Sequence, residues 1–176
     1  MTRQKNELLE WLKALAIAVI LAAVIRYFLF APIVVDGYSM MPTLQDKDRM
    51  LVNKIGYLIG SPKRFDIVVF HATEEKDYIK RIIGLPGDHI EYKEDILFIN
   101  GKSYTEPYLD TYKQDVFDGP LTEPFEIVVP EGHIFVMGDN RRYSRDSRHI
   151  GPVPIDEVLG KTNMVYWPFA DIRLVD

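Results

Sequence analysis

The sequence predicts an all-β domain, mainly antiparallel and built as a coiled sheet, preceded by one N-terminal transmembrane α-helix. Three observations support this fold class. A single long apolar segment lies near the N-terminus, short β-branched runs alternate with Pro- and Gly-containing turns from residue 33 onward, and no sustained helical periodicity follows residue 36. The length of 176 residues favours one compact domain with an appendage.

The apolar segment centres on residues 14–25, which carry no polar side-chain atom. Extended to residues 11–31, it is long enough to span a bilayer. Near its two ends lie basic and aromatic residues that favour a membrane interface: Trp11, Lys13, Arg26, Tyr27 and Phe28. A cleaved signal peptide and a buried core helix are the alternatives. Pro32 disfavours the first, and the lack of a polar stripe disfavours the second.

The charges before the apolar segment predict its orientation. Arg3, Lys5 and Lys13 exceed the acidic residues there, and basic residues stay on the cytoplasmic side. We therefore expect a single-pass protein of the cell membrane, with a cytoplasmic N-terminus at 1–10, a transmembrane anchor at 11–31 and an extracytoplasmic β domain at 32–176.

Short apolar runs and turn signals place the strands in order. The predicted strands are 33–35, 49–53, 65–70, 78–83, 96–99, 126–129, 133–137 and 163–167. A Pro-Gly turn at 85–88 ends one strand, and Asn100-Gly101 is a strong hairpin signal. Residues 105–124 read as an irregular excursion, and 155–159 as at most one helical turn.

Composition narrows the possible functions. The net charge of −5 disfavours nucleic-acid binding, and the absence of cysteine excludes disulfides, Cys-ligated metals and thiol nucleophiles. The four histidines show no short metal spacing, so we expect no metal and no cofactor. There is also no Gly-rich phosphate loop and no Gly-x-Ser-x-Gly elbow. A Ser-His-Asp triad stays open, although no histidine has a suggestive context.

Residues 36–44 form the first stretch that could carry chemistry. Gly37 permits a sharp turn beside Ser39, which could be a nucleophile or an ordinary turn serine. The residues around it are too apolar for a solvated loop and would pack on a core or contact substrate or lipid. The candidate contacts are Tyr38, Met40, Met41 and Pro42.

Residues 78–83 form the second stretch, and it contains Lys80. In a strand, Lys80 shares a face with Tyr78 and Ile82, and this apolar setting lowers the pKa of its amine. A shift from about 10.4 to about 8 requires roughly 3 kcal/mol, which burial can supply. The alternative is an edge-strand lysine that guards against aggregation. A lysine with a low pKa could act as the base for a serine.

Residues 138–148 form the third stretch, with charges of both signs among hydroxyl groups. It could be a solvated loop with surface ion pairs. It could instead hold an active site rigid through Asp–Arg pairs, with a serine hydroxyl that orients the base.

Together, the three stretches resemble the bacterial type I signal peptidases (leader peptidases, peptidase family S26) of the single-span, Gram-positive-like type. The motifs that carry the resemblance follow in chain order: Gly37-Tyr38-Ser39-Met40-Met41-Pro42-Thr43-Leu44, Tyr78-Ile79-Lys80-Arg81-Ile82-Ile83-Gly84-Leu85-Pro86-Gly87-Asp88, Met137-Gly138-Asp139-Asn140, Ser144, Asp146-Ser147-Arg148 and Gly151-Pro152-Val153.

The resemblance implies roles for individual residues. Ser39 would be the nucleophile and the oxyanion donor through its backbone N–H, Lys80 would be the general base, and the Ser144 hydroxyl would hold the lysine amine. Charged support around the site would come from Arg81, Asp139, Asp146 and Arg148. Gly37 stands where some members carry a hydroxyl that helps to bind the oxyanion.

The resemblance also implies the activity. The protein would be a membrane-bound serine endopeptidase that removes signal peptides from exported preproteins, cutting after small residues at positions −3 and −1. Its partners would be secretory preproteins, the lipid bilayer and the export translocon. The alternatives are a membrane-tethered binding module without catalysis and a self-cleaving Ser/Lys regulator. The latter would carry a helical DNA-binding segment in place of residues 14–25.

Overall fold

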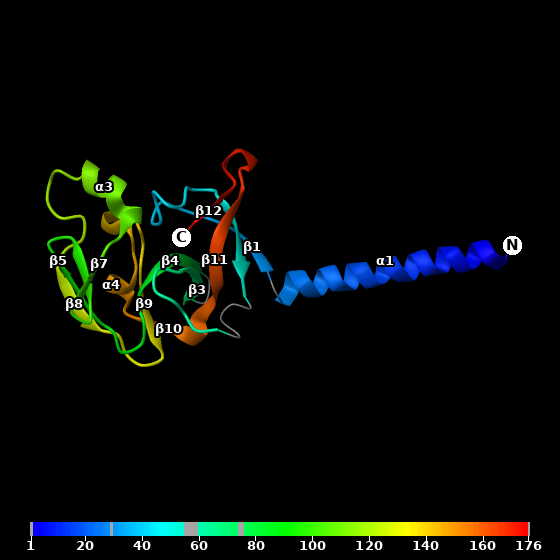
Figure 1. Cartoon of the computed structure of the whole chain (residues 1–176), viewed down its shortest axis with the longest axis horizontal. Coiled ribbons are helices and arrows are strands. Elements are labelled where there is room, and N and C mark those ends of the chain that lie inside the picture. The colour runs from blue at the N-terminus through cyan, green and yellow to red at the C-terminus, as the bar shows by residue number, and fades with distance from the viewer. Residues whose placement is uncertain (1, 29, 55–59, 74–75, 176) are drawn as a thin grey trace.

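The computed structural model describes residues 2–28, 30–54, 60–73 and 76–175, and within its first helix the side chains of residues 7 and 9–23. A long N-terminal helix, α1, projects from a domain of β-strands (Figure 1). The helices and strands are, in chain order, α1 Thr2–Phe28, β1 Phe30–Val34, β2 Arg49–Asn53, β3 Ile67–Thr73, β4 Lys76–Gly84, β5 His89–Lys93, β6 Ile96–Ile99, β7 Lys102–Tyr104, η1 Pro107–Leu109, α3 Asp110–Asp115, β8 Phe125–Val128, β9 His133–Met137, η2 Arg141–Tyr143, α4 Ser147–Ile150, β10 Val153–Pro154, η3 Ile155–Glu157, β11 Val158–Trp167, η4 Phe169–Asp171 and β12 Arg173–Leu174.

The described strands form two antiparallel sheets. The larger has the order β1-β2-β11-β3-β4-β9-β10, with β12 paired to β11. The smaller has the order β7-β6-β5-β8 and lies at the end of the domain opposite α1 (Figure 1). The strand pairs in both sheets are antiparallel, which confirms the predicted mainly antiparallel β class.

Strand register in the larger sheet positions the second and third chemical stretches. Lys80 on β4 pairs with Val68 on β3, and Arg81 on β4 pairs with Met137 on β9. Side chains alternate along a strand, so Lys80 and Arg81 leave β4 on opposite faces. The chain continues from Met137 into Asp139, which therefore starts next to Arg81.

Three clusters of buried side chains fill the domain. One packs the smaller sheet against β4 and β9, and a second joins the 36–44 loop to β2 and β11. The third contains Val68 and Ile82, the apolar neighbours of Lys80. The lysine thus emerges from the core, where removal of apolar surface from water supplies most of the stability.

Most predicted strands are confirmed within a few residues, and those at 49–53, 96–99 and 133–137 match in full. Four strands were not predicted from the sequence because they are short or carry many polar residues: β5, β7, β10 and β12. The excursion at 105–124 contains the short helices η1 and α3. The helical turn predicted at 155–159 is η3. Asn100 and Gly101 both have positive φ at the β6–β7 hairpin, as the Asn-Gly signal predicts.

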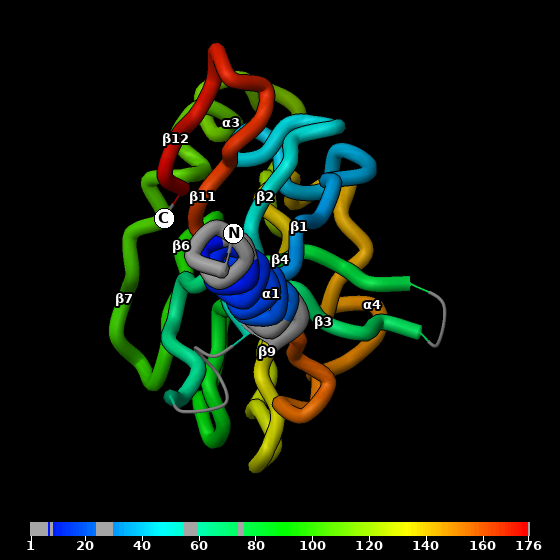
Figure 2. The backbone as a smooth tube through the Cα atoms, turned by 90° about the vertical axis from the view of Figure 1, so that its right-hand side faces the viewer, coloured from blue at the N-terminus to red at the C-terminus, as the bar shows by residue number. Residues whose placement is uncertain are grey.

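Helix α1 is exposed along its described length, and it contacts β1, the strand that follows it. Figure 2 looks along this helix and shows the β domain spread behind it. The expected membrane-interface side chains of Arg26, Tyr27 and Phe28 lie outside the described residues. Among the residues whose side chains are described, no helix is both long and apolar enough to cross a membrane.

Candidate active site

Ser39 lies on a loop that leaves the edge strand β1 and returns to β2. Gly37 adopts a φ of +99°, a conformation that suits glycine, and its N–H donates to Asp46 Oδ1 at 2.8 Å. Leu44 is fully buried and anchors the far end of the loop. The serine is therefore held on a turn whose two ends are fixed, with its side chain half-buried.

The loop around Asn140 holds the serine in place. The backbone N–H of Asn140 donates to the Ser39 carbonyl at 3.0 Å, and its side-chain amide donates to the Tyr38 carbonyl at 3.0 Å. These bonds join two loops about one hundred residues apart in the chain. They fix the carbonyl groups of Tyr38 and Ser39, and with them the backbone around the serine.

Lys80 meets Ser39 from strand β4. The Nζ of Lys80 lies 2.8 Å from Ser39 Oγ and donates to the carbonyl of Ile79 at 2.9 Å. The lysine side chain is only 4% exposed, and its Nζ lies 5.0 Å from the centre of the Tyr78 ring. The predicted contact between serine and lysine is therefore present.

Burial lowers the pKa of Lys80 to about 8, because the charged ammonium loses its hydration. The negative charges of Asp146 and Asp139 oppose this shift without cancelling it. An amine with such a pKa is neutral in a substantial fraction of molecules near pH 7–8, as a general base requires.

Arg81 and Asp139 form an ion pair that is fully buried. Arg81 donates through Nε and Nη2 to both carboxylate oxygens of Asp139, at 3.0 and 2.8 Å, and through Nη1 to the Phe65 carbonyl. Asp139 also accepts a 2.5 Å hydrogen bond from Thr43 Oγ1. The carboxylate therefore ties the serine loop to strand β4.

A second carboxylate, Asp146, begins the short helix α4. Arg148 donates to both of its oxygens at 2.9 Å, and the Gly138 N–H donates at 3.0 Å. Burial opposes ionisation of Asp146, but these donors outweigh it, and the pKa of the carboxyl lies below its ordinary value. Asp146 thus stays negative close to Lys80.

Ser144 is buried next to Gly138. Its Oγ has no hydrogen-bond partner of normal geometry among the described residues, although its hydroxyl helps to lower the pKa of Asp146. A buried hydroxyl without a full partner is unusual in a protein interior. The expected bond from Ser144 to the lysine amine stays a prediction.

The backbone N–H groups of Ser39 and Gly37 are the two candidates to donate to an oxyanion. No described residue accepts a hydrogen bond from the Ser39 N–H, so this group is free to serve a substrate. The Gly37 N–H is already bonded to Asp46, and therefore this glycine supplies no second donor in the structure.

A cavity of about 260 Å³ opens beside Ser39 and Lys80. Val34, Tyr78 and Ile79 contribute apolar walls, and Asp36, Asp77 and Arg145 contribute charged groups to its lining.

The four candidate contact residues have different surroundings. Tyr38 is exposed, and Met41 and Pro42 are half-buried. Met40 is buried in the core cluster with Leu44 and also lines the cavity, so burial excludes the expected contact of Met40 with lipid.

Three residues of this site have no role predicted from the sequence. Asn140 and Thr43 lie within its motifs, but their bonds to the opposite loop depend on tertiary contacts. Arg145 lies beside Ser144 and lines the cavity. Its position next to a candidate site serine was the one available signal.

A mainly antiparallel β fold with a serine hydroxyl beside a buried lysine amine defines a class of protein, the β-sheet serine hydrolases. The family described as signal peptidase, peptidase S26, matches residues 8–167. The chain belongs to this family and is a serine peptidase.

Individual relatives agree with this assignment. A signal peptidase I from Bacillus caldolyticus is 52% identical over 160 residues, which cover 87% of this chain and 88% of the relative. A signal peptidase IB from Staphylococcus aureus strain Mu50 is 42% identical over 180 aligned positions, covering 96% and 94%. A crystal structure of a signal peptidase I from Enterococcus faecalis V583, 41% identical, covers 58% of this chain and 97% of that chain with a TM-score of 0.56.

Proposed function

We propose that this signal peptidase cleaves preproteins with Ser39 as nucleophile and Lys80 as general base, while α1 holds the catalytic domain of residues 32–176 at the outer surface of the cell membrane. The 2.8 Å contact between Ser39 Oγ and the buried Lys80 Nζ carries this proposal. A nucleophile and its base must lie within hydrogen-bond reach, and the base must be available without its proton.

In the first half of the reaction, neutral Lys80 accepts the proton of Ser39 as Oγ bonds to the scissile carbonyl carbon. The carbonyl electrons move to its oxygen, where the Ser39 N–H donates. Collapse of this intermediate breaks the C–N bond, and the Lys80 ammonium protonates the leaving amine. An acyl-enzyme and a free mature N-terminus result.

In the second half, Lys80 removes a proton from water as the water oxygen bonds to the acyl carbon. Collapse of this second intermediate breaks the bond from the acyl carbon to Ser39 Oγ, and the Lys80 ammonium returns the proton to Oγ. The signal peptide leaves with a free carboxyl group. Throughout the cycle, one N–H of the amine stays on the Ile79 carbonyl and directs the lone pair toward Ser39. The buried Ser144 hydroxyl is the group that we assign to hold the amine's remaining N–H, and its lack of a full partner supports this role.

The charged residues around the site act through position. Asp139 and Arg81 hold the serine loop against β4. Asp146, which Arg148 holds in place, fixes Gly138 next to Ser144. None of these four residues needs to exchange a proton during the reaction. The substrates in this proposal carry small residues at positions −3 and −1, as the family resemblance implies.

Membrane attachment follows from α1 in this proposal. The helical part of the expected anchor, residues 11–28, is about 27 Å long, close to the thickness of the hydrocarbon core. Its described side chains are exposed and apolar residues dominate every face, which suits lipid better than water. Residues 30 and 31 belong to β1, so the domain begins directly at the anchor.

The anchor brings substrate and enzyme together. A preprotein that reaches the membrane, for example from the export translocon, keeps its apolar signal segment in the bilayer. Ser39 lies a few residues beyond β1, so its hydroxyl is held near the same surface. Encounter within the membrane plane raises the effective concentration of one for the other.

The test is cleavage of a preprotein in vesicles by Ser39→Ala and Lys80→Ala variants. Both should lose activity by at least about 10³-fold, because each removes one member of the reacting pair. Ser103→Ala and Lys102→Ala, exposed on β7, are matched controls that should keep it. Full activity in either site variant contradicts the proposed roles.

A further inference from the structure

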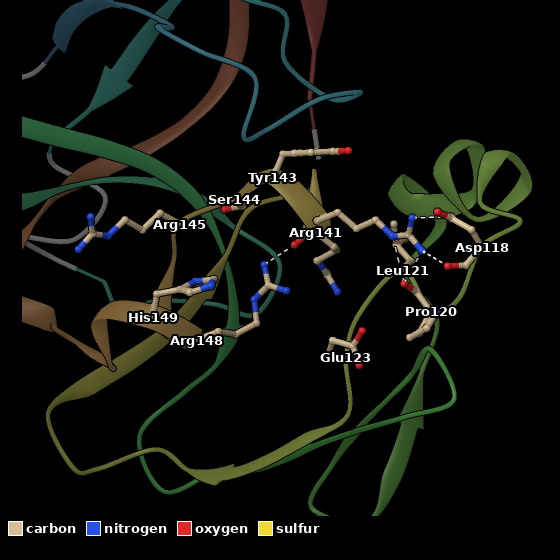
Figure 3. A pocket seen from close by; sticks show the side chains of 11 residues that line it. Asp118, Pro120, Leu121, Glu123, Arg141, Tyr143, Ser144, Arg145, Arg148 and His149 are labelled. Carbon is tan, nitrogen blue, oxygen red and sulfur yellow. Dashed lines mark hydrogen bonds and ion pairs between the residues drawn. The ribbon is translucent and has the colours of Figure 1, made fainter.

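A second cavity, of about 800 Å³, shares part of its lining with the catalytic one. Arg145 lines both of them, and from this residue the second cavity passes Ser144 and His149 toward Asp118 and Glu123 (Figure 3). Arg145 belongs to both linings, so a peptide that runs from the catalytic cavity to the second one passes beside it.

The arginines of this region differ in their partners. Arg141 is buried against Glu106, Arg142 pairs with Asp118, and Arg148 pairs with Asp146. Arg145 is exposed and makes no ion pair or hydrogen bond to any residue that the structure describes. Figure 3 shows its side chain extending away from the Asp118 and Glu123 side of the cavity.

The carboxylates on the other rim of the catalytic cavity are already paired. Asp36 contacts Lys47, and Asp77 lies 2.7 Å from His71 Nδ1. The unpaired guanidinium of Arg145 is thus the charged group of this lining that is most available to a substrate. Its complement is a carboxylate.

The shape of the molecule indicates which part of a substrate passes Arg145. Helix α1 leaves one end of the domain, and α3, which precedes the 118–123 wall of the second cavity, lies at the other end (Figure 1). A signal segment held in the bilayer beside α1 reaches Ser39 from the β1 side. A mature chain that continues away from α1 then runs toward the second cavity.

We propose that Arg145 is a specificity-determining residue that binds an acidic side chain among the first residues of the mature chain. This inference rests on the proposed function, since it needs a preprotein cut at Ser39. The contact helps substrates that carry Asp or Glu just after the cleavage site. It takes no part in proton transfer.

The experiment compares sets of preproteins that share one signal peptide and carry Asp, Asn or Lys at each of the first four mature positions in turn. The full-length enzyme in detergent micelles should favour Asp at one or two positions, with kcat/KM about two- to fivefold higher, as expected for a partly exposed ion pair. In Arg145→Gln this ratio should fall to about one, and Arg145→Glu should favour Lys at the same position.

Arg142→Gln is the matched control, because the charge of Arg142 is already compensated by Asp118, and it should keep the Asp preference. Raising the ionic strength should weaken the preference in the wild type. An equal ratio in wild type and Arg145→Gln, or no preference at any position, overturns the inference while cleavage itself persists. Cleavage that survives Ser39→Ala overturns the proposed function instead.

Discussion

At the scale of single residues, the decisive group is the Lys80 amine. Burial among apolar neighbours lowers the pKa of this amine, and two nearby carboxylates raise it. The effect of burial is the larger one. An unshifted lysine is protonated in more than 99% of molecules at pH 7, so it would rarely be ready to accept a proton. Burial therefore gives the lysine the neutral amine that its proposed role as general base requires.

The lowered pKa of Lys80 predicts the pH dependence of cleavage. Because the base must be neutral, kcat/KM should fall about tenfold per pH unit below pH 8 and level off above it. Asp146→Asn removes a negative charge that holds the proton on Lys80, so its acidic limb should move to lower pH. Peptide cleavage measured from pH 5 to 10 checks both, and a flat profile between pH 6 and 9 would contradict a lysine base.

The Arg81–Asp139 pair predicts a large stability effect. Arg81→Met leaves a buried carboxylate without its cation, which should cost about 3–5 kcal/mol in the free energy of unfolding. Arg81→Met combined with Asp139→Leu should cost less than the two single changes together, because no uncompensated charge remains. Denaturant unfolding of the four proteins in detergent measures this. Simple additivity would show that the two side chains are not coupled.

At the scale of elements, the site depends on contact between two loops. The 36–44 loop carries the serine, and the 138–148 segment supplies the groups that fix it. Gly138 lies where they meet. A Cβ built there would be 2.2 Å from Ser144 Oγ and 2.4 Å from the Ser39 carbonyl oxygen. Only glycine allows this approach.

Gly138→Ala should therefore displace the serine loop and lower kcat/KM by at least about tenfold, since small shifts of catalytic groups are costly. Gly132→Ala is the comparison. It places alanine at a positive φ of +72° but meets nothing within 4 Å, so it should strain the chain by about 1–2 kcal/mol and keep activity. Peptide cleavage with a melting curve separates the two effects. Full activity of Gly138→Ala would exclude the predicted clash.

The elements differ in how well their sequences predict them. Runs such as 96–99 and 133–137 are apolar and β-branched, and the strands follow them. Strand β5 alternates Ile90 and Tyr92 with polar residues and lies among loops in the sequence, so it was missed. Its identity depends on pairing with β6 and β8, a tertiary property.

At the scale of the whole molecule, helix α1 and the β domain follow each other along one long axis (Figure 1). Helix α1 leaves at the β1 end, and the smaller sheet and α3 occupy the far end (Figure 1). A substrate that enters from the membrane would cross the site along this axis. The position of α1 thus fits the proposed attachment and the proposed direction of the substrate.

Removal of residues 2–28 should distinguish the catalytic activity of the β domain from the effect of membrane attachment on that activity. The β domain has its own core, and among the described elements α1 contacts mainly the strand that follows it. The truncated chain should therefore still fold and cleave a soluble peptide. Its cleavage of a vesicle-embedded preprotein should fall by about 10²-fold or more, as the effective concentration is lost. Equal loss on both substrates would mean that α1 supports the fold.

The sequence alone determined the β class, most strands and the identities of Ser39 and Lys80 as the residues to examine, because apolar runs and local motifs encode them. Only the tertiary structure decided that the two side chains lie 2.8 Å apart, that the lysine is buried, and that Arg145 lines the cavity without a partner among the described residues. The reason is physical: distances and desolvation depend on which segments pack together, and residues 41 positions apart meet only when the sheet and its loops have formed.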